Sequence, residues 1–466
     1  MPRNSRCFAV VVCLVLCFSS LLFAQSAPVQ ATNVVTAMDS GVGFHVGQFD
    51  VNISGEINGF YVHDRADDTP VGGVIPSCVL CSASSAAQPN SSVRNGLLPG
   101  DLSFKISTRE HGWDTAVFFG IWPEIQSIAP STALGGKVSV NVGGNGAPNA
   151  LGTAGIDFRQ QFVTFGRPHF GTVKVGRDLG LFGQEAILND FTLLGAGTPN
   201  GNAGPGSVTL GRIGVGYIYT DFVPQISYTT PSAAGLQAAV AVIQPFDDII
   251  AGAFAGSATG GDILNGHGQP QFQGKLTYKV PAKGKVKANF WVNGMTQSEQ
   301  QNTIVVAAAP DLKVGQSVRA SGVDYGLKLG AGGAELVAYG YNGTGIGVTG
   351  LLLGGVAYGN GLVATTTRPS QGYYVQGTYT FAKKLTVGVS YGQSVLSAAN
   401  AQDRANNLDG LVRCNGSWIG QGRYALTHWV NLVAEYTHTR SEGYAAAPRT
   451  TVLDSDAFAL GTIAFF

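Results

Sequence analysis

The sequence is poor in charged residues and, past its start, in long apolar runs, and each shortage excludes a class of protein. Charged residues make up only 12% of the 466 positions, about half of the ~25% that is usual in soluble domains. Basic and acidic residues are equal in number, at 28 each, so no net basic field attracts nucleic acid. After the first two dozen residues no run of 18 apolar residues occurs, which excludes a helical membrane protein.

The N-terminus has the pattern of an export signal. Arg3 and Arg6 precede an apolar run over 8–23, and small residues follow from Ala24. A basic start, an apolar centre and small residues at the cleavage point are typical of a secretory signal peptide. The alternative is a retained membrane helix, for which the run is slightly shorter than the ~20 residues needed.

Glycine, at 66 positions, and aromatic residues, at 10%, are abundant, and together with the low charge they suggest β-structure. Over 48–62 the residues alternate, with apolar residues and glycines on one parity and, as far as Asn58, polar residues on the other. A period of two predicts a strand with one apolar and one polar face. The same alternation predicts sixteen strands, near 47–63, 101–109, 113–121, 158–165, 170–177, 223–230, 235–243, 272–280, 285–294, 322–329, 334–341, 372–381, 385–395, 417–426, 429–440 and 456–466.

The connections between these strands alternate between long and short. Even strand number, short periplasmic turns and long outer loops are the pattern of a transmembrane β-barrel, which also satisfies every backbone hydrogen bond in lipid. Sixteen strands are too many for side chains to fill the interior, so we expect a water-filled lumen. A soluble β-sandwich or propeller is the alternative fold. The predicted organisation is a signal peptide over 1–24, a short segment over 25–46 and a barrel domain over 47–466.

Three stretches, at 159–177, 225–242 and 102–121, resemble strand pairs of the general porins of Gram-negative outer membranes. The terminal Phe466 is similar to the aromatic ending that this family presents to the barrel-assembly machinery. The resemblance implies a homotrimer in the outer membrane, and a loop after Arg177 that folds into the lumen and narrows the pore. It also implies that charges on this loop face charges on the wall, a general route to selectivity.

The constriction residues that the resemblance and the strand parity suggest come from the wall and from the loop. Arg177 matches the family's wall arginine, and Lys174 shares its strand with a parity that points into the lumen. The complete set of predicted constriction residues is Arg177, Lys174, Glu185, Asp190, Arg159 and Asp101. Asp101 stands where the family usually carries an arginine, so the ion preference cannot be transferred from the family.

The cysteines outside the signal are few. Cys78 and Cys81 form a C-x-x-C in the first long loop, which fits a disulfide in an oxidising compartment. Metal and redox sites are the alternatives, but neither further ligands nor a thioredoxin-like βαβ pattern is visible. Cys414 has no local partner in the sequence.

No catalytic or cofactor-binding motif is evident, so we expect neither an enzyme nor a cofactor or metal. The sequence instead predicts a channel for passive diffusion of ions and small hydrophilic solutes across the outer membrane. The alternative is a substrate-selective channel of the same architecture, for uptake of sugars or organic acids, in which a ladder of lumen aromatics binds the solute. Trp291 is a candidate for such an aromatic.

Overall fold

A computed structural model describes residues 42–66, 79, 90–128, 153–199, 208–246, 266–281, 284–300, 317–357, 366–406, 412–444 and 452–466. The predicted signal peptide, Cys78 and Cys81 lie outside these residues. Among the described residues no helix is long and apolar enough to span a membrane.

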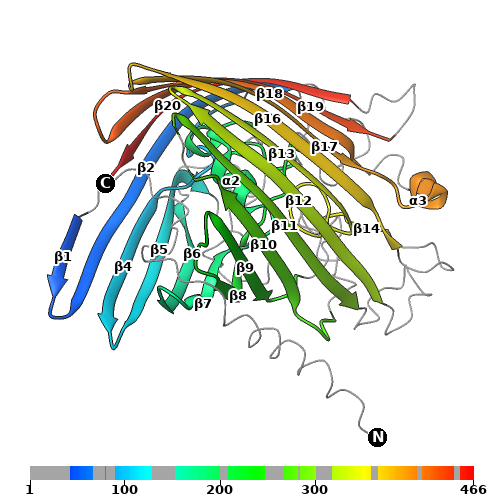
Figure 1. Cartoon of the computed structure of the whole chain (residues 1–466). Coiled ribbons are helices and arrows are strands. Elements are labelled where there is room, and N and C mark those ends of the chain that lie inside the picture. The colour runs from blue at the N-terminus through cyan, green and yellow to red at the C-terminus, as the bar shows by residue number, and fades with distance from the viewer. Residues whose placement is uncertain are drawn as a thin grey trace, which may run out of the picture.

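The structure is a closed antiparallel barrel of sixteen strands (Figure 1). Each wall strand pairs with its neighbours in chain order, and the ring closes where β20 pairs with β2. The wall consists of β2 (Phe49–Ala66), β4 (Asp101–Glu110), β5 (Trp113–Ile128), β6 (Thr153–Arg167), β7 (Gly171–Leu179), β8 (Phe222–Thr229), β9 (Leu236–Ile243), β10 (Gln271–Lys279), β11 (Val286–Gln300), β12 (Ser317–Ala331), β13 (Ala334–Thr344), β16 (Pro369–Phe381), β17 (Leu385–Leu396), β18 (Val412–Ala425), β19 (Val430–Gly443) and β20 (Val452–Phe465).

Several smaller elements accompany the wall strands. Two short strands, β1 (Val42–Val46) and β3 (Asn90–Arg94), pair with β2. A separate ribbon joins β14 (Val356–Ala357) to β15 (Thr366–Thr367). Helix α2 (Gln184–Asn189) and the 3-10 helix η1 (Phe191–Leu194) follow β7, and α3 (Ala401–Asn406) follows β17. Figure 1 shows α2 within the barrel and α3 at the end opposite the β4–β5 turn.

The two parities of the alternating sequence form the outer face and the lumen face of the barrel. On β6 and β7, Val163 and Val175 pair with each other and are exposed outward, whereas Thr164 and Lys174 pair on the lumen side. Each of the sixteen predicted strands matches an observed wall strand, and the short and long connections alternate as predicted. The predicted barrel is therefore confirmed. Many strands extend further into the long-loop end than predicted, as β11 does to Gln300.

One wall strand is interrupted. β3 and β4 both pair antiparallel with β2, at Phe60↔Arg94 and Glu56↔Asp101, and the chain between them leaves the ladder over 95–100. Side-chain hydrogen bonds replace the missing ladder, since Asn58 Nδ2 donates to Leu98 O at 2.9 Å and Asn58 Oδ1 accepts from Gly96 N at 2.9 Å. The segment 95–100 is buried. We call it the inner strap.

The first described strand and the C-terminus lie beside each other at the closing seam. Phe466 exchanges two backbone hydrogen bonds with Gly55 of β2, of 2.9 and 3.0 Å. Two residues earlier in β2, Ile53 pairs with Val42 of β1. Since β1 and β20 both run antiparallel to β2, β1 continues the line of β20 beyond the C-terminus, and Figure 1 shows that terminus beside β1.

Candidate functional site

The long connection between β7 and β8 lies inside the barrel. It leaves the wall after Leu179 and returns at Phe222, where these two residues pair. Within it are α2 and η1. We call residues 180–221 the inner loop; its residues 200–207 are outside the described part. The loop folded into the lumen that the resemblance implied is therefore present.

Lumen-facing polar side chains hold the first half of the inner loop. Gln273 Oε1 of β10 accepts from the backbone N–H groups of Leu181 and Phe182, at 2.6 and 2.8 Å. Asp324 Oδ2 of β12 accepts from Gly183 N at 2.7 Å, and Gln376 Oε1 of β16 accepts from Phe191 N at 2.8 Å. These bonds satisfy loop amides that have no partner in a sheet or helix.

The far end of the inner loop is fastened beside the closing seam. Glu435 of β19 accepts a hydrogen bond from Gly197 N. Leu97 of the inner strap donates its backbone N–H to Gly195 O at 2.9 Å. The inner loop therefore reaches from β10 to β19 and is joined there to the interrupted strand. Such a span divides the lumen.

The inner loop contains two buried residues of opposite charge, Asp190 and Arg212. Asp190 accepts from Thr192 N at 3.0 Å, Thr192 Oγ1 at 2.5 Å and Tyr217 Oη at 3.0 Å. Burial raises the pKa of Asp190, while the charge of Arg212 and these hydrogen bonds act in the opposite direction. Burial likewise lowers the pKa of Arg212, which Asp190 counteracts. Asp190 therefore organises the loop from within.

Apolar packing supports this arrangement. Phe182, Ile187 and Tyr217 of the inner loop belong to one buried cluster with lumen-facing Trp291 and Tyr374 of the wall. Tyr374 Oη also donates to Ala186 O at 2.8 Å. Because these aromatic side chains are covered by the loop, they fix its position in the lumen.

Among the ion pairs on the lumen side of the wall, two involve predicted constriction residues. Lys275 Nζ of β10 is 3.0 Å from Glu185 Oε1 of α2, and it also donates to Gln184. Both charged side chains are about one-sixth exposed, at 16% and 15%. Lys174 of β7 pairs with Asp178 on the same strand, and its Nζ lies 4.8 Å from the ring centre of Phe162. An acid of the loop thus faces a base of the wall.

The predicted Arg177 does not face the lumen, which corrects the prediction. It pairs with Gln161 and Pro224, both on the outward parity of exposed Val163 and Ile226. The physical reason is the strand period: Arg177 is three residues from Lys174, and such residues lie on opposite faces.

Arg159 shares the outward parity of Gln161. Its Nε is 2.7 Å from Asp157 Oδ2, and its guanidinium lies 5.5 and 5.8 Å from the ring centres of Trp122 and Phe222. The structure therefore places it in a cluster where the inner loop rejoins the wall, and not with Glu185.

Three other predicted residues are on the inside. Lys174 faces the lumen, Glu185 is on the inner loop beside Lys275, and Asp101 is buried on the lumen side, where its Oδ1 accepts from Ser103 Oγ at 2.6 Å. Asp190 is buried within the loop. The role of these residues in selectivity stays a prediction.

Sequence reasoning missed Lys275 as the partner of Glu185, and it missed Gln273 and Asp324 as loop anchors. The strand parity placed Gln273 and Lys275 on the polar face, so their lumen orientation was available from the sequence. Their contacts with the loop were not, because those contacts join positions about 90 residues apart.

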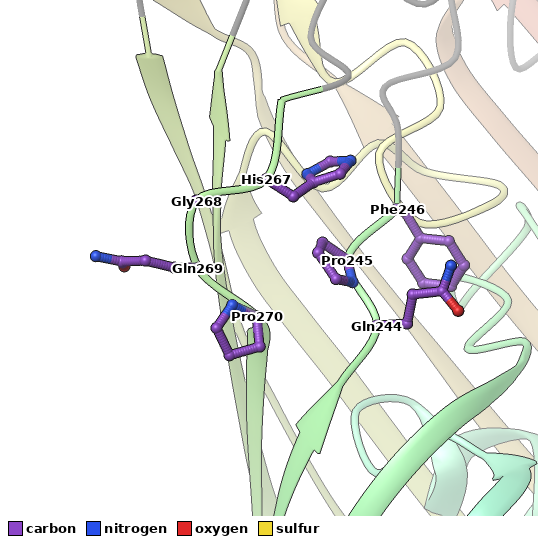
Figure 2. A pocket seen from close by; sticks show the side chains of 7 residues that line it. All are labelled: Gln244, Pro245, Phe246, His267, Gly268, Gln269 and Pro270. Atoms are coloured by element: carbon purple, nitrogen blue, oxygen red, sulfur yellow. The ribbon is translucent and has the colours of Figure 1, made fainter. Parts of the chain in front are cut away.

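A hollow of about 500 Å³ opens at the outer ends of β9 and β10. Figure 2 shows Gln244 and Phe246 pointing to one side of it and Gln269 pointing away. The backbone N–H of Phe246 donates to Gln297 Oε1 of β11 at 3.0 Å. Lys and Arg are absent from the described lining of this hollow, which is separate from the ion pairs of the lumen.

Comparison with known proteins gives the family. Residues 9–444 match the family model of the Gram-negative porins, and the chain belongs to that family. No curated protein sequence matches it closely enough to count as a relative. The protein is therefore an outer-membrane β-barrel that forms a channel.

Three solved structures of similar fold are distant in sequence. The outer membrane channel DcaP of Acinetobacter baumannii is 16% identical, with a TM-score of 0.60 over 91% of this chain and 99% of that one. An anion-selective porin from Comamonas acidovorans is 14% identical, with a TM-score of 0.53 over 90% and 100%. OmpF of Salmonella typhi, in complex with daunomycin, is 12% identical, with a TM-score of 0.52 over 91% and 100%. At these identities the likeness shows the fold.

Proposed function

We propose that this channel passes small hydrophilic solutes and ions by passive diffusion, and that the inner loop sets its size limit. The observation that carries the proposal is the fastening of the inner loop to several wall strands, at Gln273, Asp324, Gln376 and Glu435. A loop bonded at both ends of its path narrows the lumen permanently and needs no solute to hold it in place. No chemical step is needed, and we propose no enzymatic activity.

The alternative, a channel with an aromatic ladder that binds its solute, receives little support. The lumen-facing aromatic residues Trp291, Tyr339, Tyr341 and Tyr374 are each less than 5% exposed and belong to the cluster beneath the inner loop. Side chains that are covered in this way cannot stack against a passing sugar.

We also propose a homotrimer, on the resemblance to general porins. The outward face of the wall carries exposed apolar residues such as Ile226, Val240 and Val389. This face is apolar enough for both lipid and subunit contacts.

The test is the diffusion of neutral sugars into liposomes that contain the purified protein. We expect monosaccharides to enter at rates proportional to concentration, and tetrasaccharides to be excluded. Saturable entry of one sugar would favour the selective channel. Free passage of tetrasaccharides would remove the inner loop as the size limit, and an absence of any permeability would contradict the proposal as a whole.

A further inference from the structure

Lumen-facing acids and bases of the wall differ in their access to water. Among the described strand residues, the inward carboxylates that are buried are Glu56, Asp64, Asp101, Asp178, Glu299, Asp324 and Glu435. Of the inward bases, Arg94 is buried, whereas Lys105, Lys174, Lys275, Lys328 and Arg423 keep part of their surface exposed. The numbers of inward acids and bases therefore differ from the numbers that are accessible to water in the pore.

Hydrogen bonds explain why the acids are hidden. Asp324 and Glu435 accept backbone N–H groups of the inner loop, from Gly183 and Gly197. Asp178 accepts from Gln160 Nε2 at 2.7 Å, and Asp101 accepts from Ser103 Oγ. These carboxylates anchor the loop or the wall, and the donors that surround them keep them away from the water of the lumen.

The basic side chains are not buried in the same way. Lys174 is 19% exposed while its partner Asp178 is 2% exposed, so the ammonium is the member of that pair that faces water. Lys275 and its partner Glu185 are exposed to the same extent. The same holds for Lys328 and Glu335, which form an ion pair of 2.9 Å. The remaining bases, Lys105 and Arg423, are half-buried. Neither forms an ion pair within the described part of the chain, but the charge of Glu335 acts on Arg423.

Acids near the short turns do not restore the balance. Asp50 pairs with His45, and Asp114 Oδ1 lies 3.5 Å from Arg109 Nε. Lys279 and Lys287, at the turn end of β10 and β11, are exposed on the lumen parity. The excess of accessible positive charge thus continues toward the end with the short turns.

Neighbouring wall residues hold the basic side chains in position. Lys105 pairs with Phe118 across β4 and β5, and the ring of Phe118 stacks on that of Phe162 with 5.0 Å between centres. The ammonium of Lys174 lies over Phe162. Lysine stems that rest on apolar surface keep their charged ends in water.

From this asymmetry we infer that the channel prefers anions, and that Lys105, Lys174, Lys275, Lys328 and Arg423 form a basic belt that concentrates small anions in the lumen. The inference rests on the proposed function and names its solute class. One unit charge ~7 Å away in water changes the local concentration of a monovalent ion by about threefold. Lys105 and Arg423 together therefore give a preference of several-fold at low salt, and screening reduces it as salt rises.

The experiment is the zero-current potential of the full-length channel in planar bilayers across a KCl gradient, for the wild type and for Lys105→Gln combined with Arg423→Gln. We expect chloride to be at least about threefold more permeant than potassium in the wild type, and the double variant to lose most of that preference. The matched control is Arg319→Gln, which removes an exposed base on the outward parity of β12. It should leave the potential unchanged.

The outcomes separate the two proposals. A channel that conducts but has no preference, or that prefers potassium, overturns the anion inference and leaves passive diffusion intact. An equal loss of preference in Arg319→Gln would assign the effect to overall charge and also overturn the belt. Absence of conductance contradicts the proposed function itself. Heat-modifiable migration in gels checks that each variant has folded.

Discussion

Glu185 Oε1, on a helix inside the barrel, lies 3.0 Å from Lys275 Nζ on the wall. This pair joins the inner loop, which contains Glu185, to the basic belt, which contains Lys275. Both side chains remain partly exposed. Neutralising one member therefore changes the charge that a passing ion meets, and the two members should act in opposite directions.

We predict that Glu185→Gln shifts permeability toward anions by about twofold. The glutamine keeps the shape of the side chain while Lys275 loses its counter-charge, and a partly screened unit charge changes local ion concentrations by roughly this factor. The measurement is the zero-current potential in a salt gradient. Asp456→Asn is the control, since Asp456 is exposed on the outward parity of β20. An unchanged potential in Glu185→Gln would remove this pair from the ion path.

Asp190→Asn should have the complementary phenotype. Asp190 is buried and accepts hydrogen bonds from Thr192 and Tyr217. An amide cannot accept all of these bonds, and it removes the largest negative charge that acts on Arg212, so we expect a loss of about 1–3 kcal/mol in stability. Thermal unfolding of the purified protein measures this loss. The potential should stay close to that of the wild type, whereas Glu185→Gln should keep the wild-type unfolding temperature. The reverse pattern would contradict both assignments.

The wall was predictable from sequence because its physical causes are local. Strand parity separates Gln273 and Lys275 from Phe272 and Leu276 without knowledge of neighbours, and short turns mark where strands reverse. The same local rule was sufficient to reject Arg177 as a lumen residue, since it differs in parity from Lys174. The prediction of Arg177 as a lumen residue rested on the family resemblance and not on parity.

The interior was less predictable because it depends on contacts between distant positions. Asp324 anchors Gly183 across 141 residues, and Glu435 anchors Gly197 across 238. Parity indicates that such carboxylates face inward, but only the closed barrel shows that loop amides hide them. The inner strap escaped prediction for a related reason, since its hydrogen bonds come from the side chain of Asn58 on another strand.

Gly197→Ala tests the close approach between the two arms of the inner loop. Gly197 has φ +62°, and an added Cβ would collide with the backbone of Gly211. Gly332, in the β12–β13 turn, has the same φ of +62° and open space around it. Both variants bear the cost of a left-handed backbone, roughly 1 kcal/mol, so a larger loss of thermal stability in Gly197→Ala isolates the collision. We also expect noisier single-channel currents in that variant. Equal stability in the two variants would show that the backbone of the loop shifts enough to accommodate the added Cβ.

Removal of Phe466 tests the role of the chain end in assembly. The deletion removes both the terminal ring and the two backbone hydrogen bonds with Gly55 that close the seam. We expect a several-fold lower yield of folded protein in the outer membrane, measured by heat-modifiable migration of membrane extracts. Phe466→Ala keeps the backbone bonds and removes the ring, whereas Phe466→Tyr keeps an aromatic end. If the ring is the assembly signal, Phe466→Ala behaves like the deletion and Phe466→Tyr like the wild type. If Phe466→Ala assembles normally and the deletion does not, the seam bonds matter and the ring does not.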